Sequence, residues 1–162
     1  MNTTTPTIDW YTNQFITNSL KQYLKEKGFR LSEPEEQYSL NFGNAIFSTK
    51  LLSKEVIEIR GTITEAAGTG TREWVGKNDN VFLEVMHFFI DVIFSPVNFF
   101  STINGDERRR CLCLPDLEQY RKVLTRLKEY FASNKMHLKV YLINQNGSVD
   151  VFYLNPNKKD KE

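Results

Sequence analysis

Glu58 and Arg60 are the residues of this chain whose types and spacing are most suggestive of chemistry. They fall in Val56-Ile57-Glu58-Ile59-Arg60-Gly61, where apolar and charged residues alternate. Because side chains alternate along a strand, Glu58 and Arg60 share one face, with their backbones about 6.5–7 Å apart. A carboxylate holds a divalent cation and a guanidinium engages a phosphodiester, so the pair suits a metal-and-phosphate site. Taken alone, a solvated ion pair on an amphipathic strand is the favoured interpretation.

The elements that position this pair follow from hydrophobic periodicity. Apolar residues three and four apart predict a helix over residues 9–27, which Gly28 ends with Phe29 as its apolar partner. Alternating apolar and polar residues then predict three strands joined by tight turns, which is an antiparallel meander. We place these strands at residues 38–42, 45–51 and 55–63, with turns at Gly43-Asn44 and Ser53-Lys54.

Beyond the third strand, residues 61–80 form the least regular stretch, with several glycines and one large anchor, Trp74. We interpret this stretch as an exposed loop, since long loops in compact domains often carry function. Residues 81–94 have a wide apolar face that predicts a helix, which Pro96 ends or kinks. The remaining elements are predicted as a strand at 111–114, a helix opening at Pro115-Asp116, and a hairpin of strands 138–143 and 149–154.

The resulting order of elements, α-β-β-β-α-β-α-β-β, predicts one α/β domain. A meander followed by a helical crossover to a further strand implies a mixed central sheet with flanking helices. The domain spans residues 9–155, between a flexible N-terminus at residues 1–8 and a disordered tail at residues 156–162.

The αβββαβ order, with Glu58-Ile59-Arg60-Gly61 closing the third strand, resembles the PD-(D/E)XK, or restriction endonuclease-like, superfamily. The resemblance covers nearly all of residues 9–154. It implies a core in which the strands around Ile46, Ile59 and Leu112 are neighbours, followed here by a C-terminal helix and hairpin. It also implies that Asn44 takes the place of the first metal-binding aspartate. Glu58 then corresponds to the acidic residue of the second half-motif, and Arg60 to its lysine.

Two departures from the family pattern bear on activity. Asn44 offers an amide oxygen but no charge, which weakens a Mg²⁺ site, and Arg60 cannot act as a general base because it does not deprotonate. Glu26 or Glu36 could each add a carboxylate. Two functions therefore stay open. The favoured one is a non-catalytic binding or interaction module, and the alternative is a Mg²⁺-dependent nuclease acting on DNA or RNA through Asn44, Glu58 and Arg60.

Candidate binding residues are predicted from the chemistry of their side chains. Besides Arg60, the run Arg108-Arg109-Arg110 could contact a nucleic-acid backbone, with Trp74 as an aromatic contact. The favoured interpretation instead places the arginine run on a solvated loop, partly neutralised by Asp106 and Glu107. The phenylalanine-rich segment 82–100 is interpreted as the central helix of the core. If one side of it is uncovered, it becomes an interface for a protein partner or a homodimer.

Composition excludes several classes of protein. The chain has 162 residues, 40% hydrophobic, with 21 Lys and Arg against 20 Asp and Glu, which excludes a disordered chain and a polycationic binder. Cys111 and Cys113 would share a strand face and are interpreted as small hydrophobes in a reducing, cytoplasmic compartment. Polar residues interrupt the apolar stretch 81–103, so neither a membrane span nor a membrane partner is expected.

Overall fold

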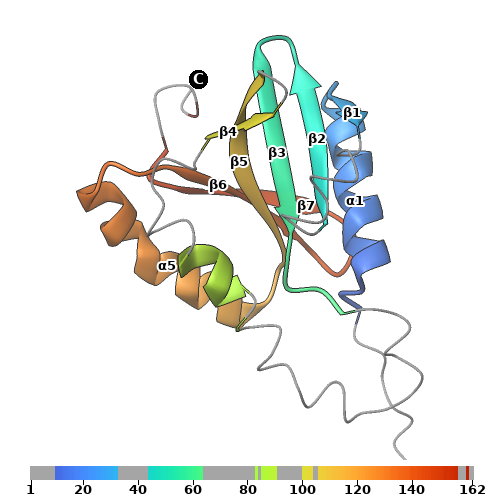
Figure 1. Cartoon of the computed structure of the whole chain (residues 1–162). Helices are drawn as coiled ribbons and strands as arrows, with labels where there is room; N and C mark the ends of the chain where they lie inside the picture. The colour runs from blue at the N-terminus through green and yellow to red at the C-terminus, as the bar shows by residue number, and fades with distance from the viewer. Residues whose placement is uncertain are drawn as a thin grey trace, which may run out of the picture.

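The computed structural model describes residues 10–32, 44–63, 83, 85–90, 100–103, 106–156 and 160. Within these residues the chain is α/β, with a mixed β-sheet flanked by helices, as the order of elements predicts (Figure 1). The predicted strand at 38–42, the loop from residue 64 onward with Trp74, and both ends of the predicted helix at 81–94 lie outside the described residues.

The sheet is built from a long path of paired strands. The strands are β1 (Arg30–Ser32), β2 (Ala45–Lys50), β3 (Ser53–Ile59), β4 (Phe100–Ile103), β5 (Asp106–Pro115), β6 (Leu138–Ile143) and β7 (Val149–Leu154). Their order is β1-β2-β3-β5-β6-β7, and β4 pairs with β5 off this path. β3, β5 and β6 run parallel to one another, while the other pairs are antiparallel. The strands around Ile46, Ile59 and Leu112 are therefore neighbours.

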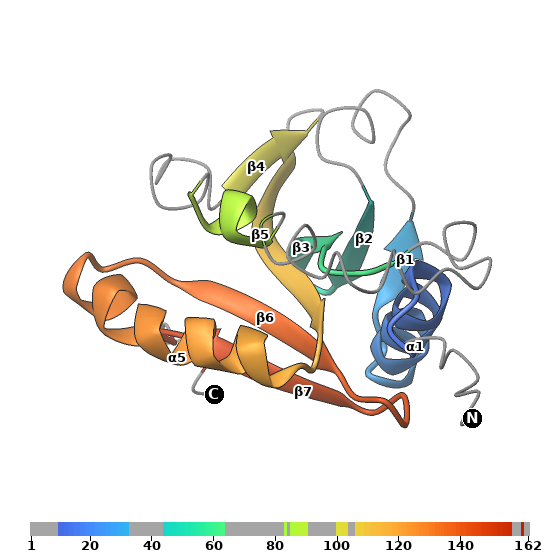
Figure 2. The ribbon, with the colours of Figure 1, turned by 90° about the horizontal axis from the view of Figure 1, so that it is seen from below.

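β5 is the strand on which the sheet divides. One of its edges pairs with β3, from Arg109 to Cys113. Its other edge is shared, because β4 pairs with residues 106–109 and β6 pairs with residues 111–115. Figure 2 shows β4 beside the first part of β5, and β6 leaving the second part of β5 in a different direction. The strand is longer than the sequence predicts, and it includes the arginine run that was expected on a loop.

Helix α1 (Asn13–Glu26) packs on one face of the sheet. Thr12 caps it by accepting a hydrogen bond from the Phe15 backbone N–H at 3.2 Å, and its apolar stripe is buried. Gly28 adopts φ +88, and the N–H groups of Gly28 and Phe29 donate to the carbonyls of Lys25 and Leu24. This pair of hydrogen bonds is the Schellman motif, which needs a residue of positive φ after the helix. The predicted glycine stop is confirmed.

The opposite face of the sheet is covered by helix α5 (Glu118–Ser133) and by a helical segment at residues 85–90. Tyr120, Leu124 and Phe131 form the buried stripe of α5. Asp116 does not cap this helix, because its carboxylate takes two hydrogen bonds from Arg121 instead. In the 85–90 segment, the buried core residues are Val85, Phe88 and Phe89. That part of the phenylalanine-rich segment belongs to the core, as expected.

Two predicted boundaries of the meander are wrong. The turn between the second and third strands lies at Leu51-Leu52, not at Ser53-Lys54, because Lys50 pairs with Ser53. Leucine is a poor predictor of this turn, since Leu51 has to adopt φ +54. The third strand ends at Ile59, not Ile63. Gly61, at φ +72, turns the chain so that Ile63 bridges Thr12 ahead of α1.

Candidate functional site

Strand β3 carries a buried glutamate on each of its faces. Glu55 is 2% exposed and Glu58 is fully buried. They are an odd number of residues apart, so alternation directs Glu55 toward the α1 face and Glu58 toward the α5 face. Burying a carboxylate is costly unless cations and hydrogen bonds compensate. Each glutamate is compensated by side chains from β5 or β6, which defines two clusters.

The first cluster, called the Glu58 cluster, consists of Glu58, Arg60 and Arg110. Arg110 donates from Nε to Glu58 Oε2 at 2.5 Å and from Nη2 to Oε1 at 3.3 Å. Arg60 Nη2 donates to the same Oε1 at 3.3 Å. Both carboxylate oxygens are therefore engaged by guanidinium groups. The predicted Glu58–Arg60 contact exists, but Glu58 is fully buried and Arg60 is half-buried, so the pair is not on a solvated strand face.

Apolar groups surround the Glu58 cluster. The Arg110 guanidinium lies 4.8 Å from the centroid of the Phe88 ring, and its side chain is 7% exposed. Gly61, directly after Arg60, lies against α5, where an added Cβ would sit 3.0 Å from the Tyr120 hydroxyl. Helical residues 85–90 and α5 thus close this face over the charges. The arrangement suits a structural ion pair held at low dielectric.

Asn44 does not join Glu58. Its amide Nδ2 donates to Asn13 Oδ1 at 2.7 Å, at the start of α1. The residue that faces Glu58 across the ladder is Ala45, one position later, so alternation directs Asn44 toward the other face. Glu26 is also elsewhere, since it accepts from Gln22 on the exposed side of α1, and Glu36 lies outside the described residues.

The residues therefore do not fit the Mg²⁺ ion that the family resemblance implies. Mg²⁺ takes oxygen ligands with near-octahedral geometry and keeps several of its waters. Both Glu58 oxygens accept hydrogen bonds from arginine, the side chain is fully buried and so leaves no room for those waters, and Asn44 is on the other side of the sheet. Within the described ranges, no group of three or more His, Cys, Asp or Glu side chains could hold a metal.

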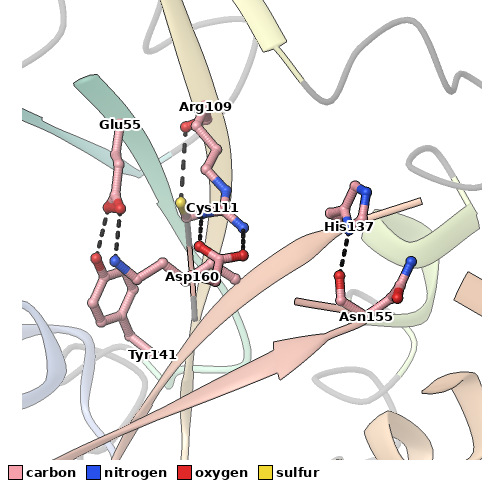
Figure 3. Close-up of polar contacts among 8 residues, drawn as sticks. Glu55, Arg109, Cys111, His137, Tyr141, Asn155 and Asp160 are labelled. Carbon is pink, nitrogen blue, oxygen red and sulfur yellow. Dashed lines mark hydrogen bonds and ion pairs between the residues drawn. The ribbon is translucent and has the colours of Figure 1, made fainter. Parts of the chain in front are cut away.

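The second cluster, called the Glu55 cluster, lies on the α1 face (Figure 3). Lys139 Nζ donates to Glu55 Oε1 at 2.8 Å, and the Tyr141 hydroxyl donates to Oε2 at 2.6 Å. Burial raises the pKa of Tyr141 well above its ordinary value, and the Glu55 charge raises it further. Burial is the largest single influence on Lys139 and lowers its pKa, but the charge and hydrogen bond of Glu55, together with Cys111 and Tyr153, raise the pKa overall.

Arg109 extends this cluster toward the C-terminal tail. It stands opposite Glu55 in the ladder, and its guanidinium donates twice to Asp160, at 2.5 and 2.8 Å. Figure 3 shows this paired contact beside Cys111. Burial, followed by the Glu55 charge, raises the Cys111 pKa, and burial raises that of Cys113. Both cysteines are buried and free, so they are small core residues and not thiolate nucleophiles.

Arg108, the first arginine of the run, is also bound internally. Arg108 Nη1 lies 3.3 Å from the Glu55 carbonyl oxygen and 3.4 Å from that of Ser48, and its guanidinium stacks 4.6 Å from the Phe47 ring centroid. Arg108, Arg109 and Arg110 thus all have protein partners on β2, β3 or the tail. The expectation of a solvated loop at this run is wrong.

The end of the β2–β3 hairpin is the most exposed apolar feature among the described residues. Leu51 is 91% exposed and Leu52 is 98% exposed. On the α1 side of this turn, Lys50 Nζ donates to the Lys27 carbonyl at 2.6 Å, and Arg30 pairs with Thr49. We call Leu51 and Leu52 the leucine tip, and Lys27, Arg30 and Lys50 its basic rim.

Sequence reasoning missed the Glu55 cluster and the leucine tip. Glu55 had a signal, because it lies on the same face of the strand as Ile57 and Ile59 and is therefore a charge on an apolar side. Its partners, Lys139 and Tyr141, come from β6, which is remote in sequence. The leucine tip had no signal once the turn was placed at Ser53-Lys54.

Comparison with known proteins does not add a relative. Neither a scan against protein-family models, nor a search of curated proteins, nor a search of solved structures found a match. In the part of the chain that the structure describes, no helix is long and apolar enough to cross a membrane. The features of this chain that bear on function are therefore the two clusters and the leucine tip.

Proposed function

We propose that this chain is a non-catalytic binding module built on a restriction endonuclease-like core. The order of the sheet supports this core. The β1-β2-β3 meander leads through the helical residues 85–90 to β5, which is parallel to β3, and α5 then leads to β6. Glu58 and Arg60 stand at the end of the central strand, where the family resemblance expects its acidic half-motif.

The observation that carries the proposal is the state of the Glu58 carboxylate. A metal-dependent nuclease needs an acidic side chain that reaches both its metal and the substrate. Glu58 is fully buried, and its two oxygens accept hydrogen bonds from Arg110 and Arg60. The position that would serve metal chemistry in the family serves as a structural ion pair here.

A binding module also needs a surface, and the leucine tip supplies one. Nearly complete exposure of two adjacent leucines costs solvation free energy that a partner would recover. The arginines that sequence reasoning assigned to nucleic acid are less suitable, because Arg108, Arg109 and Arg110 are bound within the fold. The proposed binding surface is therefore the end of the β2–β3 hairpin.

Calorimetric titration with Mg²⁺ and Mn²⁺, together with cleavage assays on single- and double-stranded DNA and RNA, tests the proposal. Wild-type protein should bind neither ion with micromolar affinity and should cleave none of the substrates. Glu118→Gln, on the exposed side of α5, is the matched control for Glu58→Gln. Metal-dependent cleavage that Glu58→Gln abolishes and Glu118→Gln preserves would overturn the proposal in favour of the nuclease. Binding of either ion to the wild-type protein with micromolar affinity, even without cleavage, would also contradict the proposal.

A further inference from the structure

We infer that the partner of the leucine tip is an anionic lipid surface. In this mode Leu51 and Leu52 enter the boundary between headgroups and acyl chains, and the basic rim lies at the level of the headgroups. The inference rests on the proposed function, because it names the partner of the binding module.

The shape is convex and apolar. Leu51 and Leu52 occupy the two-residue turn between the paired residues Lys50 and Ser53. Figure 1 shows this turn projecting at the top of the sheet, beyond β1 and the end of α1. Side chains at such a position cannot fold back onto the core, which agrees with their exposed fractions of 91% and 98%. A projecting tip enters a soft surface without requiring a matching pocket.

The backbone at the tip is strained. Leu51 adopts φ +54, a region that favours glycine, asparagine or aspartate in hairpin turns. Within the fold, leucine gains almost no packing at a side chain that is 91% exposed. Residues held in disfavoured conformations cluster at functional sites. A contact outside this chain gives the leucine a role that the fold itself does not.

The charge beside the tip is positive. Lys27 and Lys50 are exposed and joined through the Lys27 carbonyl, and Arg30 is exposed on the neighbouring strand β1. Anionic leaflets attract basic residues at their surface, each adding roughly fivefold in affinity. Two leucines alone give weak insertion, since even a single long acyl chain anchors a protein only marginally. The tip therefore needs the basic rim, and binding should require anionic lipid.

The composition favours lipid over a macromolecular partner. Binding hot spots between proteins are enriched in Trp, Tyr and Arg, with Leu under-represented, and lysine is depleted at protein interfaces. Single-stranded nucleic acids are bound through aromatic stacking and arginine. Leucines beside lysines suit a bilayer interface, where lysine stems lie along apolar groups. The proposed partner departs from the sequence expectation of no membrane partner, which rested on the lack of a spanning segment, whereas docking of a hairpin end requires none.

Co-sedimentation with vesicles tests the inference. At 0.1 M NaCl, wild type should bind mixed vesicles of phosphatidylcholine and phosphatidylserine, whose anionic headgroups attract the basic rim, and should not bind pure phosphatidylcholine vesicles. Leu51→Ser/Leu52→Ser should lower the affinity at least tenfold, and Lys27→Gln/Lys50→Gln about tenfold or more. Leu83→Ser and Lys122→Gln/Lys128→Gln are the matched controls and should bind as wild type does. Raising NaCl to 0.5 M should weaken wild-type binding, because salt screens the basic rim.

A direct readout of insertion is the fluorescence of Leu52→Trp, which should shift to shorter wavelength on the anionic vesicles. No binding of wild type to those vesicles overturns the inference, and so does binding that the leucine substitutions leave unchanged. Self-association abolished by Leu51→Ser/Leu52→Ser would assign the tip to a second copy and also overturn it. These failures differ from failure of the proposed function, which is metal-dependent cleavage in the nuclease assays.

Discussion

Glu55 and Glu58 lie on opposite faces of the same strand, and each is buried against cations from β5 or β6. The carboxylate of Glu58 is held by Arg110 and Arg60, and that of Glu55 by Lys139 with the Tyr141 hydroxyl. Ion pairs thus link β3 to its neighbour β5 on one face and to β6, which lies beyond β5 in the sheet, on the other face. The structural role of these charges leads to predictions that the nuclease alternative does not make.

Glu58→Gln should lower the free energy of unfolding by about 3–5 kcal/mol, because it leaves the buried Arg110 guanidinium without a compensating charge. Urea unfolding measures the change. Replacing both partners, as Glu58→Leu/Arg110→Met, should recover most of the loss, since an apolar pair removes both buried charges. A Glu58→Gln variant as stable as wild type would show that the ion pair is not structural.

The free energy of unfolding should fall at alkaline pH, because groups buried on the α1 face resist losing their protons. The pKa values of Cys111, Tyr141 and Lys139 are raised in the fold above ordinary values of 9.0, 10.0 and 10.5. The native state therefore keeps protons that the unfolded chain releases, so their contribution is complete below about pH 8 and is lost as pH rises. Each such proton lowers the free energy of unfolding by about 1.4 kcal/mol per pH unit.

Urea unfolding at pH 7.5, 9, 10 and 11 checks this dependence. Tyr141→Phe should reduce the slope above pH 10 by close to one proton, since it removes one of the raised groups. Tyr130→Phe, on the exposed side of α5, is the matched control. A free energy of unfolding that stays constant from pH 7.5 to 11 would contradict the prediction.

Asp160→Asn should cost about 1–2 kcal/mol in urea unfolding, because it removes the charge from a twofold contact with Arg109. The Arg109 side chain is 18% exposed and that of Asp160 is 5% exposed, so solvent compensates poorly. Asp150→Asn weakens a single contact with Arg121, which Asp116 also holds, and the Asp150 side chain is 57% exposed, so the cost should stay below about 0.5 kcal/mol. Equal losses in the two variants would show that the tail contact adds nothing.

Alanine substitutions at three glycines of positive φ separate the cost of backbone strain from the cost of steric crowding. Gly28 and Gly147 have room for a Cβ, with nearest atoms at 3.7 and 3.5 Å, whereas at Gly61 the nearest atom is 3.0 Å away on buried Tyr120. Alanine should cost about 1–2 kcal/mol at the first two positions. Gly61→Ala should cost about 1–3 kcal/mol more, since Tyr120 has to move. Thermal or urea unfolding of the three variants is decisive, and equal losses would contradict the close contact.

Local signals in the sequence were sufficient for several elements. The end of α1 was predictable because Gly28 and Phe29 provide the left-handed residue and the apolar partner of a helix ending. The last hairpin was predictable from Asn144-Gln145-Asn146-Gly147 between two apolar alternations. In these segments the residues that decide the structure are adjacent in the chain, so periodicity and turn chemistry suffice.

The site depends on residues that are remote in sequence. Glu58 looked solvated because alternation assigns a face to a side chain but does not say what covers that face. Its covering comes from α5 and residues 85–90, and its strongest partner, Arg110, lies on a strand that was predicted to begin only at Cys111. The three-residue strand β1 is too short for a periodic signal. Whether the core belongs to the restriction endonuclease-like superfamily stays a prediction.

Leu51 places stability and binding in competition at one position. Its φ of +54 suits glycine, so Leu51→Gly should relieve backbone strain of about 1–2 kcal/mol, which exceeds the entropy that glycine loses on folding, and the fold should become slightly more stable. The same substitution removes half of the leucine tip. Selection for stability alone would thus erode the surface on which binding depends, and a stabilised variant of this protein is a poor starting point for finding its partner. A screen for partners should therefore keep the native turn, even where that lowers the yield of folded protein.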